Sequence, residues 1–264
     1  MPEGDVLARV ADRLGRALTG RALTLAELRW PGVEPAMLRG STVAEVASYG
    51  KHLLHRTDEG GTLHTHLRMD GSWRIERSGT RQAENLARRP ATRAILGNEQ
   101  WTTAGLDLGM LDIIRTRDER LILARLGPDL LAADFADIGL TQVLQRATER
   151  SSSPICEVLL DQRVAAGIGT IYAAESLFER RMWPWTATGE LASGELAAIY
   201  LTARKLMQRV VTGGFNARVN HVHARKGLPC HRCGTPIARG TANPAPYERP
   251  IFYCPRCQSA RPIE

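Results

Sequence analysis

The chain has 264 residues, of which 43% are hydrophobic, and it has a formal net charge of +7 at pH 7. This length and composition indicate a globular protein with one large domain or two of ordinary size. No apolar run approaches the roughly 18 residues that cross a bilayer, and no secretory pattern stands at the start, so we expect a cytoplasmic protein without a membrane partner. The basic balance favours a polyanionic partner such as nucleic acid.

The first half of the chain predicts one helix followed by short strands. Apolar residues four apart from Val6 to Leu18 form a helical stripe over Asp5–Leu18. Alternating runs such as 63–75 and 110–115 then follow, separated by turn signals that include Asp58-Glu59-Gly60-Gly61 and Gly97-Asn98. This pattern predicts a β-sandwich or barrel with a leading helix, which we assign to residues 1–128.

The middle of the chain predicts helices. An Ala/Asp-rich connection at 130–139 precedes Ser153-Pro154, which has the pattern of an N-cap and a first helical residue. Apolar residues at helical spacing follow Ser193, and Gly213-Gly214 ends that segment. Residues 129–225 are therefore expected to form a helical domain, and the fold class is expected to be α+β.

The last segment, residues 226–264, contains four of the five cysteines in two C-x-x-C pairs. In a reduced chain this pattern predicts a tetrahedral site for one structural Zn²⁺ on a β-hairpin, because four protein ligands leave no open position for a substrate. A tail with few large apolar residues would draw much of its folding energy from the metal. The expected ligands are Cys230, Cys233, Cys254 and Cys257.

Two further features are consistent with a nucleic-acid partner. Arg232, Arg249 and Arg256 lie in or beside the hairpin, and although each alone could be a solvated charge, together they favour contact with DNA or RNA. The segment 159–178 contains a break at Gly167-Ile168-Gly169 before a second helix that starts near Thr170. Glycines there would let backbone N–H groups approach an anion, although most G-x-G pairs are only turns.

Four segments together resemble the formamidopyrimidine-DNA glycosylase and endonuclease VIII family of base-excision repair enzymes. They span nearly the whole chain, in the family's order. The segments are PEG at 2–4, SYGKHLL at 48–54, LLDQRVAAGIGTIYAAESLF at 159–178 and FYCPRCQ at 252–258. The third resembles the family's helix-two-turns-helix, and the fourth lies in its terminal zinc finger.

The resemblance implies a bifunctional DNA glycosylase and abasic-site lyase. It assigns Pro2, freed by removal of Met1, as the nucleophile that forms a Schiff base at C1′, with β,δ-elimination afterwards. It assigns Glu3 to acid/base work and Lys51 to a phosphate contact that aids proton transfer. Taken singly, Pro2 and Glu3 could be no more than a helix start and Lys51 no more than a strand charge.

The resemblance also implies the DNA-binding residues. The segment HTHLRMDGSW resembles the loop that fills the gap left by a flipped base, with Met69 as the wedge. We expect His64 and His66 beside it to be structural rather than metal ligands. The expected DNA-binding residues are Arg68, Met69, Asp70, Gly169, Thr170, Arg249 and Arg256.

Three departures from the family pattern concern the grip on DNA more than the chemistry. Thr170 replaces the asparagine of the family's GxGN, Val6 replaces an acidic residue, and Cys156 replaces a lysine and is expected to be an ordinary buried thiol.

The PEG start and the short stretch from Phe215 to Cys230 favour the endonuclease VIII branch, which acts mainly on oxidised pyrimidines. Two alternatives stay open: an enzyme for 8-oxoguanine and formamidopyrimidines, and a non-catalytic zinc-dependent DNA-binding protein. The expected partner is damaged double-stranded DNA, and also single-stranded or bubble DNA. The protein is expected to be a monomer and, in a bacterium, associated with the nucleoid.

Overall fold

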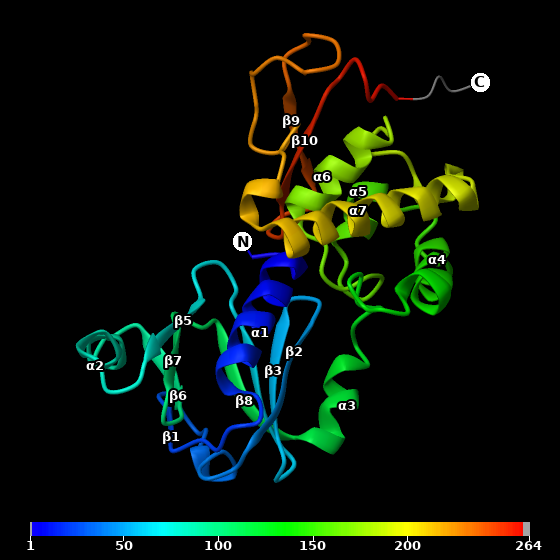
Figure 1. Ribbon diagram of the computed structural model, residues 1–264. Helices are drawn as coiled ribbons and strands as arrows, with labels where there is room; N and C mark the ends of the chain where they lie inside the picture. Colours follow the sequence, from blue (N-terminus) through cyan, green and yellow to red (C-terminus); the bar gives the residue numbers. More distant parts are fainter. Residues whose placement is uncertain (1, 261–264) are drawn as a thin grey trace. The chain divides into compact units, whose positions relative to one another are not determined.

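The computed structural model describes residues 2–260, and the chain divides into two compact units that meet in sequence between Arg125 and Leu126 (Figure 1). The first unit is a β-sandwich with helices, and the second combines helices with a β-hairpin. The predicted α+β fold class is therefore confirmed. None of the helices among residues 2–260 has the length and apolar character needed to span a membrane.

The first unit contains two antiparallel four-stranded sheets, with strand orders β1-β6-β7-β5 and β2-β3-β4-β8. The strands are β1 (Leu25–Leu28), β2 (Val43–Tyr49), β3 (His52–Thr57), β4 (Gly61–His66), β5 (Ser72–Arg77), β6 (Thr92–Gly97), β7 (Trp101–Leu106) and β8 (Met110–Arg115). Both predicted hairpin turns are confirmed: the 58–60 turn joins β3 to β4, and Asn98 follows β6.

The leading helix is α1 (Gly4–Leu18), which begins one residue earlier than predicted. Its apolar stripe is fully buried at Leu7, Leu14 and Leu18, and it packs with residues of both sheets, among them Leu53 and Trp73. Burial of such side chains contributes about 1.5–3 kcal/mol each, so this stripe fixes the helix on the sandwich.

Two short helices of the first unit were not predicted. Helix α2 (Arg81–Ala87) buries only Ala83 and Leu86, and its start depends on the Thr80 side chain, which accepts a hydrogen bond from the Ala83 N–H at 3.3 Å. Helix α3 (Glu119–Leu123) is anchored by Glu119, whose carboxylate accepts three hydrogen bonds from Arg56 at 2.8–3.0 Å. Neither helix is long enough to produce a periodic apolar pattern.

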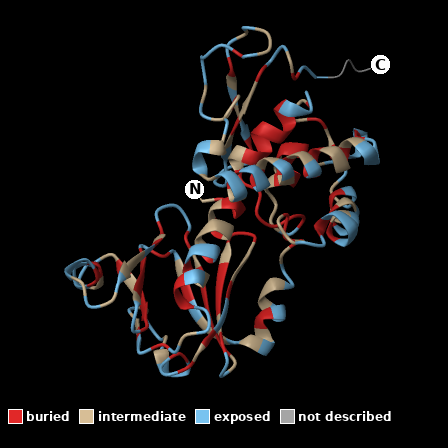
Figure 2. Cartoon of the chain, in the orientation of Figure 1, coloured by how far each residue is buried: buried red, intermediate tan, exposed pale blue. Residues whose placement is uncertain are grey.

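The helices of the second unit share a large core, and a smaller apolar cluster joins α6 to the segment that carries the cysteines. Figure 2 shows buried residues concentrated on α6. The largest fully enclosed side chains in this core include Tyr172, Tyr200 and Phe135, and Ala242 and Ile251 of the hairpin join it. The elements are α4 (Leu140–Thr148), α5 (Ile155–Leu160), α6 (Thr170–Glu179), α7 (Ser193–Gly213), β9 (Ala238–Ala242) and β10 (Arg249–Tyr253).

Both units also contain short helical turns. They are 3₁₀ turns at Pro35–Met37, Thr116–Asp118, Thr188–Glu190 and Phe215–Ala217, and a π-helical turn at Phe135–Gly139.

The predicted start of α5 was wrong by one residue. Pro154 is the N-cap, with an extended ψ of 138°, and the helix begins at Ile155. The reason is tertiary: Pro154 bridges to Ala187, and the Ile155 N–H donates to the Thr186 carbonyl at 2.9 Å, which takes the place of a Ser153 cap. The predicted end of α7 is confirmed, because Gly214 adopts φ +81° directly after it.

Candidate metal centre and nucleic-acid interface

The four predicted cysteines lie together, one pair before β9 and the other directly after β10. Their sulfur atoms all lie within 4.8 Å of one another, with Cys233 Sγ 3.4 Å from Cys254 Sγ and Cys230 Sγ 3.9 Å from Cys257 Sγ. The Arg232 N–H donates to Cys230 Sγ at 3.4 Å, as expected for a knuckle that presents thiolates. The prediction that these four residues are placed to bind a metal ion is confirmed.

The pKa values of the cysteine thiols differ. Hydrogen bonds from the side chain and backbone of Thr235 lower the pKa of Cys233 to about 6, whereas burial and the neighbouring cysteines raise the pKa of Cys257 to about 12. Four thiolates at this distance repel one another, so a divalent cation is needed to stabilise the fully deprotonated set. Four sulfur donors in a compact cluster fit Zn²⁺.

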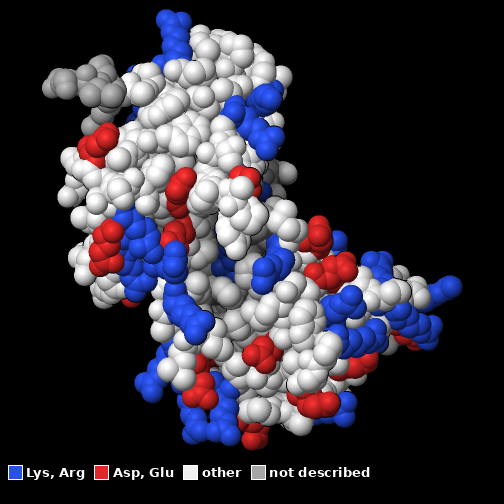
Figure 3. Space-filling model, turned by 180° about the vertical axis from the view of Figure 1, so that it is seen from behind, with Lys and Arg blue, Asp and Glu red and all other residues white. Residues whose placement is uncertain are grey.

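The arginines near the hairpin separate into two roles. Arg232 donates to the Phe178 carbonyl and to Glu179, both at 2.7 Å, and its guanidinium lies 4.2 Å from the Phe178 ring centroid. It therefore fastens the cysteine knuckle to α6. Arg249 and Arg256 are exposed, and neither makes an ion pair within residues 2–260. On the face drawn in Figure 3, basic side chains form several separate clusters with acidic side chains between them.

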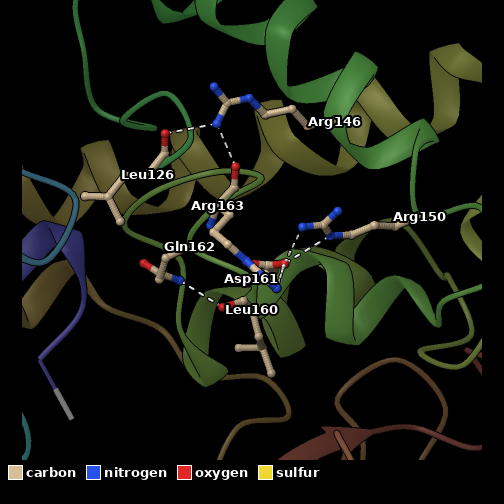
Figure 4. A network of polar contacts seen from close by, with 7 residues as sticks. All are labelled: Leu126, Arg146, Arg150, Leu160, Asp161, Gln162 and Arg163. Carbon is tan, nitrogen blue, oxygen red and sulfur yellow. Dashed lines mark hydrogen bonds and ion pairs between the residues drawn. The ribbon is translucent and has the colours of Figure 1, made fainter. Parts of the chain in front are cut away.

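The turn between α5 and α6 is held by the side chain of Gln162. Its Nε2 donates to the carbonyl of Leu160 at 2.9 Å (Figure 4). The same Nε2 donates to the carbonyl of Ile168 at 2.8 Å, and Oε1 accepts from the Gly167 N–H at 3.0 Å. Gly167 has φ +110°, which favours glycine. Helix α6 begins at Thr170, as predicted, so the fixed turn sets the direction of its N-terminus.

Arginines surround the same turn. Arg146 donates to the carbonyls of Leu126 at 2.9 Å and Arg163 at 2.7 Å, and Asp161 accepts from both Arg150 and Arg163 at 3.0 Å (Figure 4). Burial opposes ionisation of Asp161, but these donors outweigh it and lower its pKa. The carboxylate therefore stays ionised and ties the end of α4 to the turn.

Sequence reasoning missed the residue that anchors the segment after α7. Glu175 on α6 is 3% exposed, and its carboxylate accepts from the consecutive N–H groups of His221, Val222 and His223 at 2.7–2.9 Å. This clamp places the His223 ring beside Thr170, with Nε2 3.5 Å from the hydroxyl oxygen. No pattern in the sequence signals a contact between residues 46 to 48 positions apart.

The three predicted catalytic residues all lie in the first unit. Glu3 is the N-cap of α1 and is 2% exposed, and Pro2 directly precedes it. Lys51 is 7% exposed and lies in the tight turn between β2 and β3. Within this unit, Figure 1 shows the start of α1 and the β2–β3 turn at the same end of the sandwich. Met1 lies outside the described residues.

The predicted wedge segment lies in the turn between β4 and β5. Because His52 pairs with His66, this turn lies at the same end of its sheet as Lys51. Arg68 has φ +54°, and the Met69 side chain after it is 58% exposed. The fold therefore presents the Met69 side chain to solvent rather than to the core.

Cys156 and Val6, two of the three departures from the family pattern, lie in apolar surroundings. Cys156 is fully buried on α5, and burial raises the pKa of its thiol to about 12, so it is an unreactive core residue. Val6 packs against the core of the sandwich.

Comparisons with known proteins place this architecture in the class of proteins with a helix-two-turns-helix (H2TH) domain. The family sequence model of the formamidopyrimidine-DNA glycosylase N-terminal domain matches residues 1–109. The family sequence model of the formamidopyrimidine-DNA glycosylase H2TH domain matches residues 126–220. The chain belongs to the formamidopyrimidine-DNA glycosylase family, which also contains proteins named endonuclease 8. The predicted family is thus confirmed.

Individual relatives match over nearly their whole length. The probable endonuclease 8 2 of Streptomyces coelicolor is 39% identical, covering 98% of this chain and 94% of that protein. The DNA-(apurinic or apyrimidinic site) lyase Nei2 of Mycolicibacterium smegmatis is 34% identical, covering 98% of this chain and 100% of that protein. The crystal structure of the MutM (Fpg) protein of Thermus thermophilus is 29% identical and superimposes with a TM-score of 0.79, covering 99% of this chain and 100% of that one.

Proposed function

We propose that the chain is a bifunctional DNA glycosylase and abasic-site lyase that removes oxidised bases from DNA. The observation that carries this proposal is the coincidence of Pro2 and Glu3 at the start of α1 with Lys51 in the β2–β3 turn, at one end of the sandwich. The relatives named endonuclease 8 and abasic-site lyase support it, because their similarity extends over 98% of the chain.

The chemistry follows from a secondary amine at the start of a helix. Removal of Met1 frees the Pro2 nitrogen, and the positive end of α1 disfavours its protonated form. The nitrogen bonds to C1′ while the damaged base leaves with the glycosidic electron pair, and ring opening of the sugar gives an iminium ion. The iminium acidifies the C2′ hydrogen, whose removal expels the 3′ phosphate. A second elimination expels the 5′ phosphate.

The other residues of the first unit support these steps. Glu3, as the N-cap of α1, moves protons near the sugar, and Lys51 contacts the phosphate. Met69, flanked by Arg68 and Asp70, fills the space of the extruded nucleotide, because unstacking a base needs an apolar wedge.

The second unit grips the duplex. Gly169 and Thr170 present the N-terminus of α6 to a phosphate, and Arg249 and Arg256 extend from the hairpin. One structural Zn²⁺ held by the four cysteines would fix that hairpin. We propose a catalytic domain over 1–128, a helical domain over 129–225 and a zinc finger over 226–264. The proposed partner is damaged double-stranded DNA, including bubble or single-stranded substrates, bound by a monomer in the cytoplasm.

The proposed substrates are oxidised pyrimidines. The PEG start and the short stretch between α7 and the first cysteine favour this branch, and relatives named endonuclease 8 support it. An enzyme for oxidised purines is the second candidate, which the 32% identity with the formamidopyrimidine-DNA glycosylase of Thermus thermophilus favours.

A cleavage assay on defined duplexes tests both levels of the proposal. We expect nicking of an abasic site and excision of thymine glycol faster than of 8-oxoguanine. Faster excision of 8-oxoguanine would establish the second candidate. Binding without nicking of the abasic duplex would establish a non-catalytic DNA-binding protein.

A further inference from the structure

A cluster of imidazoles lies beside Lys51 on the outer face of the β2-β3-β4-β8 sheet. His52 opens β3 immediately after Lys51, and it pairs across the ladder with His66. Side chains alternate along a strand, and Leu53 belongs to the core, so His52 is on the opposite face together with His64 and His66. The ring centroid of His52 is 5.0 Å from the centroids of both His64 and His66.

Two of these rings share a hydrogen bond. His52 Nδ1 lies 2.8 Å from His64 Nε2, so one proton lies between two nitrogens that can both hold it. The third ring makes a hydrogen bond to the backbone instead. His66 Nδ1 accepts the Arg68 N–H at 2.8 Å, at the start of the β4–β5 turn that carries Met69. The His52–His64 pair is therefore the part of the cluster whose proton can be redistributed.

The free protein keeps this cluster uncharged. Burial is the largest cause, and electrostatic interactions with the neighbouring His64, His66, Arg68 and Lys51 add to it, so the pKa of His52 is lowered to about 3. Burial first, and then Arg68, Lys51 and His64, lower the pKa of His66 to about 4.

Carboxylates face only the far end of the cluster. Burial lowers the pKa of His64. Two carboxylates partly offset this effect: Asp112, which lies opposite His64 on the neighbouring strand β8, and Glu119 of α3. Lys51 and Arg68 therefore act on the His52 end of the imidazole pair. At the His64 end lie Asp112 and Glu119, and Glu119 is itself paired with Arg56.

We propose that the His52–His64 pair takes up a proton when a DNA phosphate binds at the Lys51 end, so that it becomes a second cation beside Lys51. This inference rests on the proposed function, because it requires a phosphate at Lys51. The phosphate would offset the repulsion that His52 experiences from Lys51 and Arg68, and so would favour positive charge on the pair. The proton would then spread over the hydrogen-bonded pair, with Asp112 and Glu119 stabilising its His64 end.

The test measures proton uptake rather than catalysis. Calorimetric titration with a duplex that contains a non-cleavable abasic analogue, at pH 6.5 and constant salt in buffers of different ionisation enthalpy, gives the number of protons bound per complex. We expect uptake of about half to one proton, with Kd rising about threefold to tenfold per pH unit above pH 6. His52→Gln and His64→Gln should each abolish the uptake. His55→Phe, which removes a histidine of the same strand on the core face, should leave it unchanged.

Each outcome decides between the two levels of the proposal. Tight binding without proton uptake by the wild-type protein would overturn this inference and leave the proposed function intact, and so would uptake that persists in both glutamine variants. Absence of any binding to the abasic duplex would overturn the proposed function itself. If a variant fails to fold, NMR titration of imidazole resonances in the wild-type protein, free and bound, decides: His52 and His64 must titrate at higher pH in the complex.

Discussion

The histidine buried in the centre of the sandwich should make the protein sensitive to acid. His55 is 1% exposed, and its ring lies 4.9 Å from that of Trp73. Among residues 2–260 neither of its ring nitrogens has a full hydrogen-bond partner, although the nearby backbone of Leu63 offsets part of the effect of burial. Burial lowers the pKa of His55 from 6.5 to about 4. We predict that His55→Phe stabilises the protein, and more so at low pH.

The magnitude follows from the proton that His55 binds only when unfolded. Between pH 6.5 and about 4 the unfolded chain is protonated at His55 and the folded chain is not, so stability present above pH 6.5 is lost as the pH falls. Each pKa unit corresponds to about 1.4 kcal/mol, which gives a total loss of about 3 kcal/mol and about 2 kcal/mol by pH 5. Removing two unsatisfied polar atoms adds about 1 kcal/mol at any pH.

Urea denaturation of the two proteins at pH 7.5 and pH 5.0, followed by circular dichroism, measures this difference. The free energy of unfolding of the phenylalanine variant should exceed that of the wild type by about 1 kcal/mol at pH 7.5 and by about 3 kcal/mol at pH 5.0. The histidines on the outer face titrate in both proteins, so their contribution cancels. An equal difference at both pH values would show that His55 does not gain a proton on unfolding in this range.

Three further predictions concern the second unit. Cys254→Ser should reduce bound zinc from one ion per chain, measured by elemental analysis, and weaken DNA binding while the sandwich stays folded; zinc-free protein with normal affinity would contradict this. Arg249→Ala should reduce the slope of log affinity against log salt by about one, and an unchanged slope would exclude a phosphate contact there. Gly127→Ala places a Cβ 2.1 Å from the Val164 carbonyl oxygen and should lower the melting temperature by several degrees, whereas Gly194→Ala, with nothing within 4 Å, should not.

Local signals allowed the sequence to predict the elements that frame the site. Helix α1 follows from an apolar stripe that one face of a helix can bury, and the start of α6 at Thr170 follows from the glycines before it. The metal centre is also local in this sense, because each C-x-x-C pair forms its own knuckle and the hairpin joins the two. Such features depend on neighbours in the chain, which the sequence displays directly.

Features that depend on contacts between distant residues could not be predicted. Helix α3 is fastened by the pair Arg56–Glu119, and the clamp from Glu175 to the backbone at 221–223 joins residues far apart in the chain. The His52–His64 hydrogen bond exists because of the register between β3 and β4, which places residue 64 opposite residue 54. A one-residue change of register would move His64 to the core face, so no inspection of the sequence alone reveals the pair.

Covalent trapping tests whether the Pro2 nitrogen carries out the chemistry. Borohydride added during reaction with an abasic duplex should reduce the iminium to a stable amine, and mass spectrometry of the digested adduct should locate the DNA on Pro2 of a chain that has lost Met1. An added N-terminal tag should abolish trapping and cleavage while DNA binding persists. Equally efficient trapping by a chain that retains Met1, or an adduct located on Lys51, would show that Pro2 is not the nucleophile.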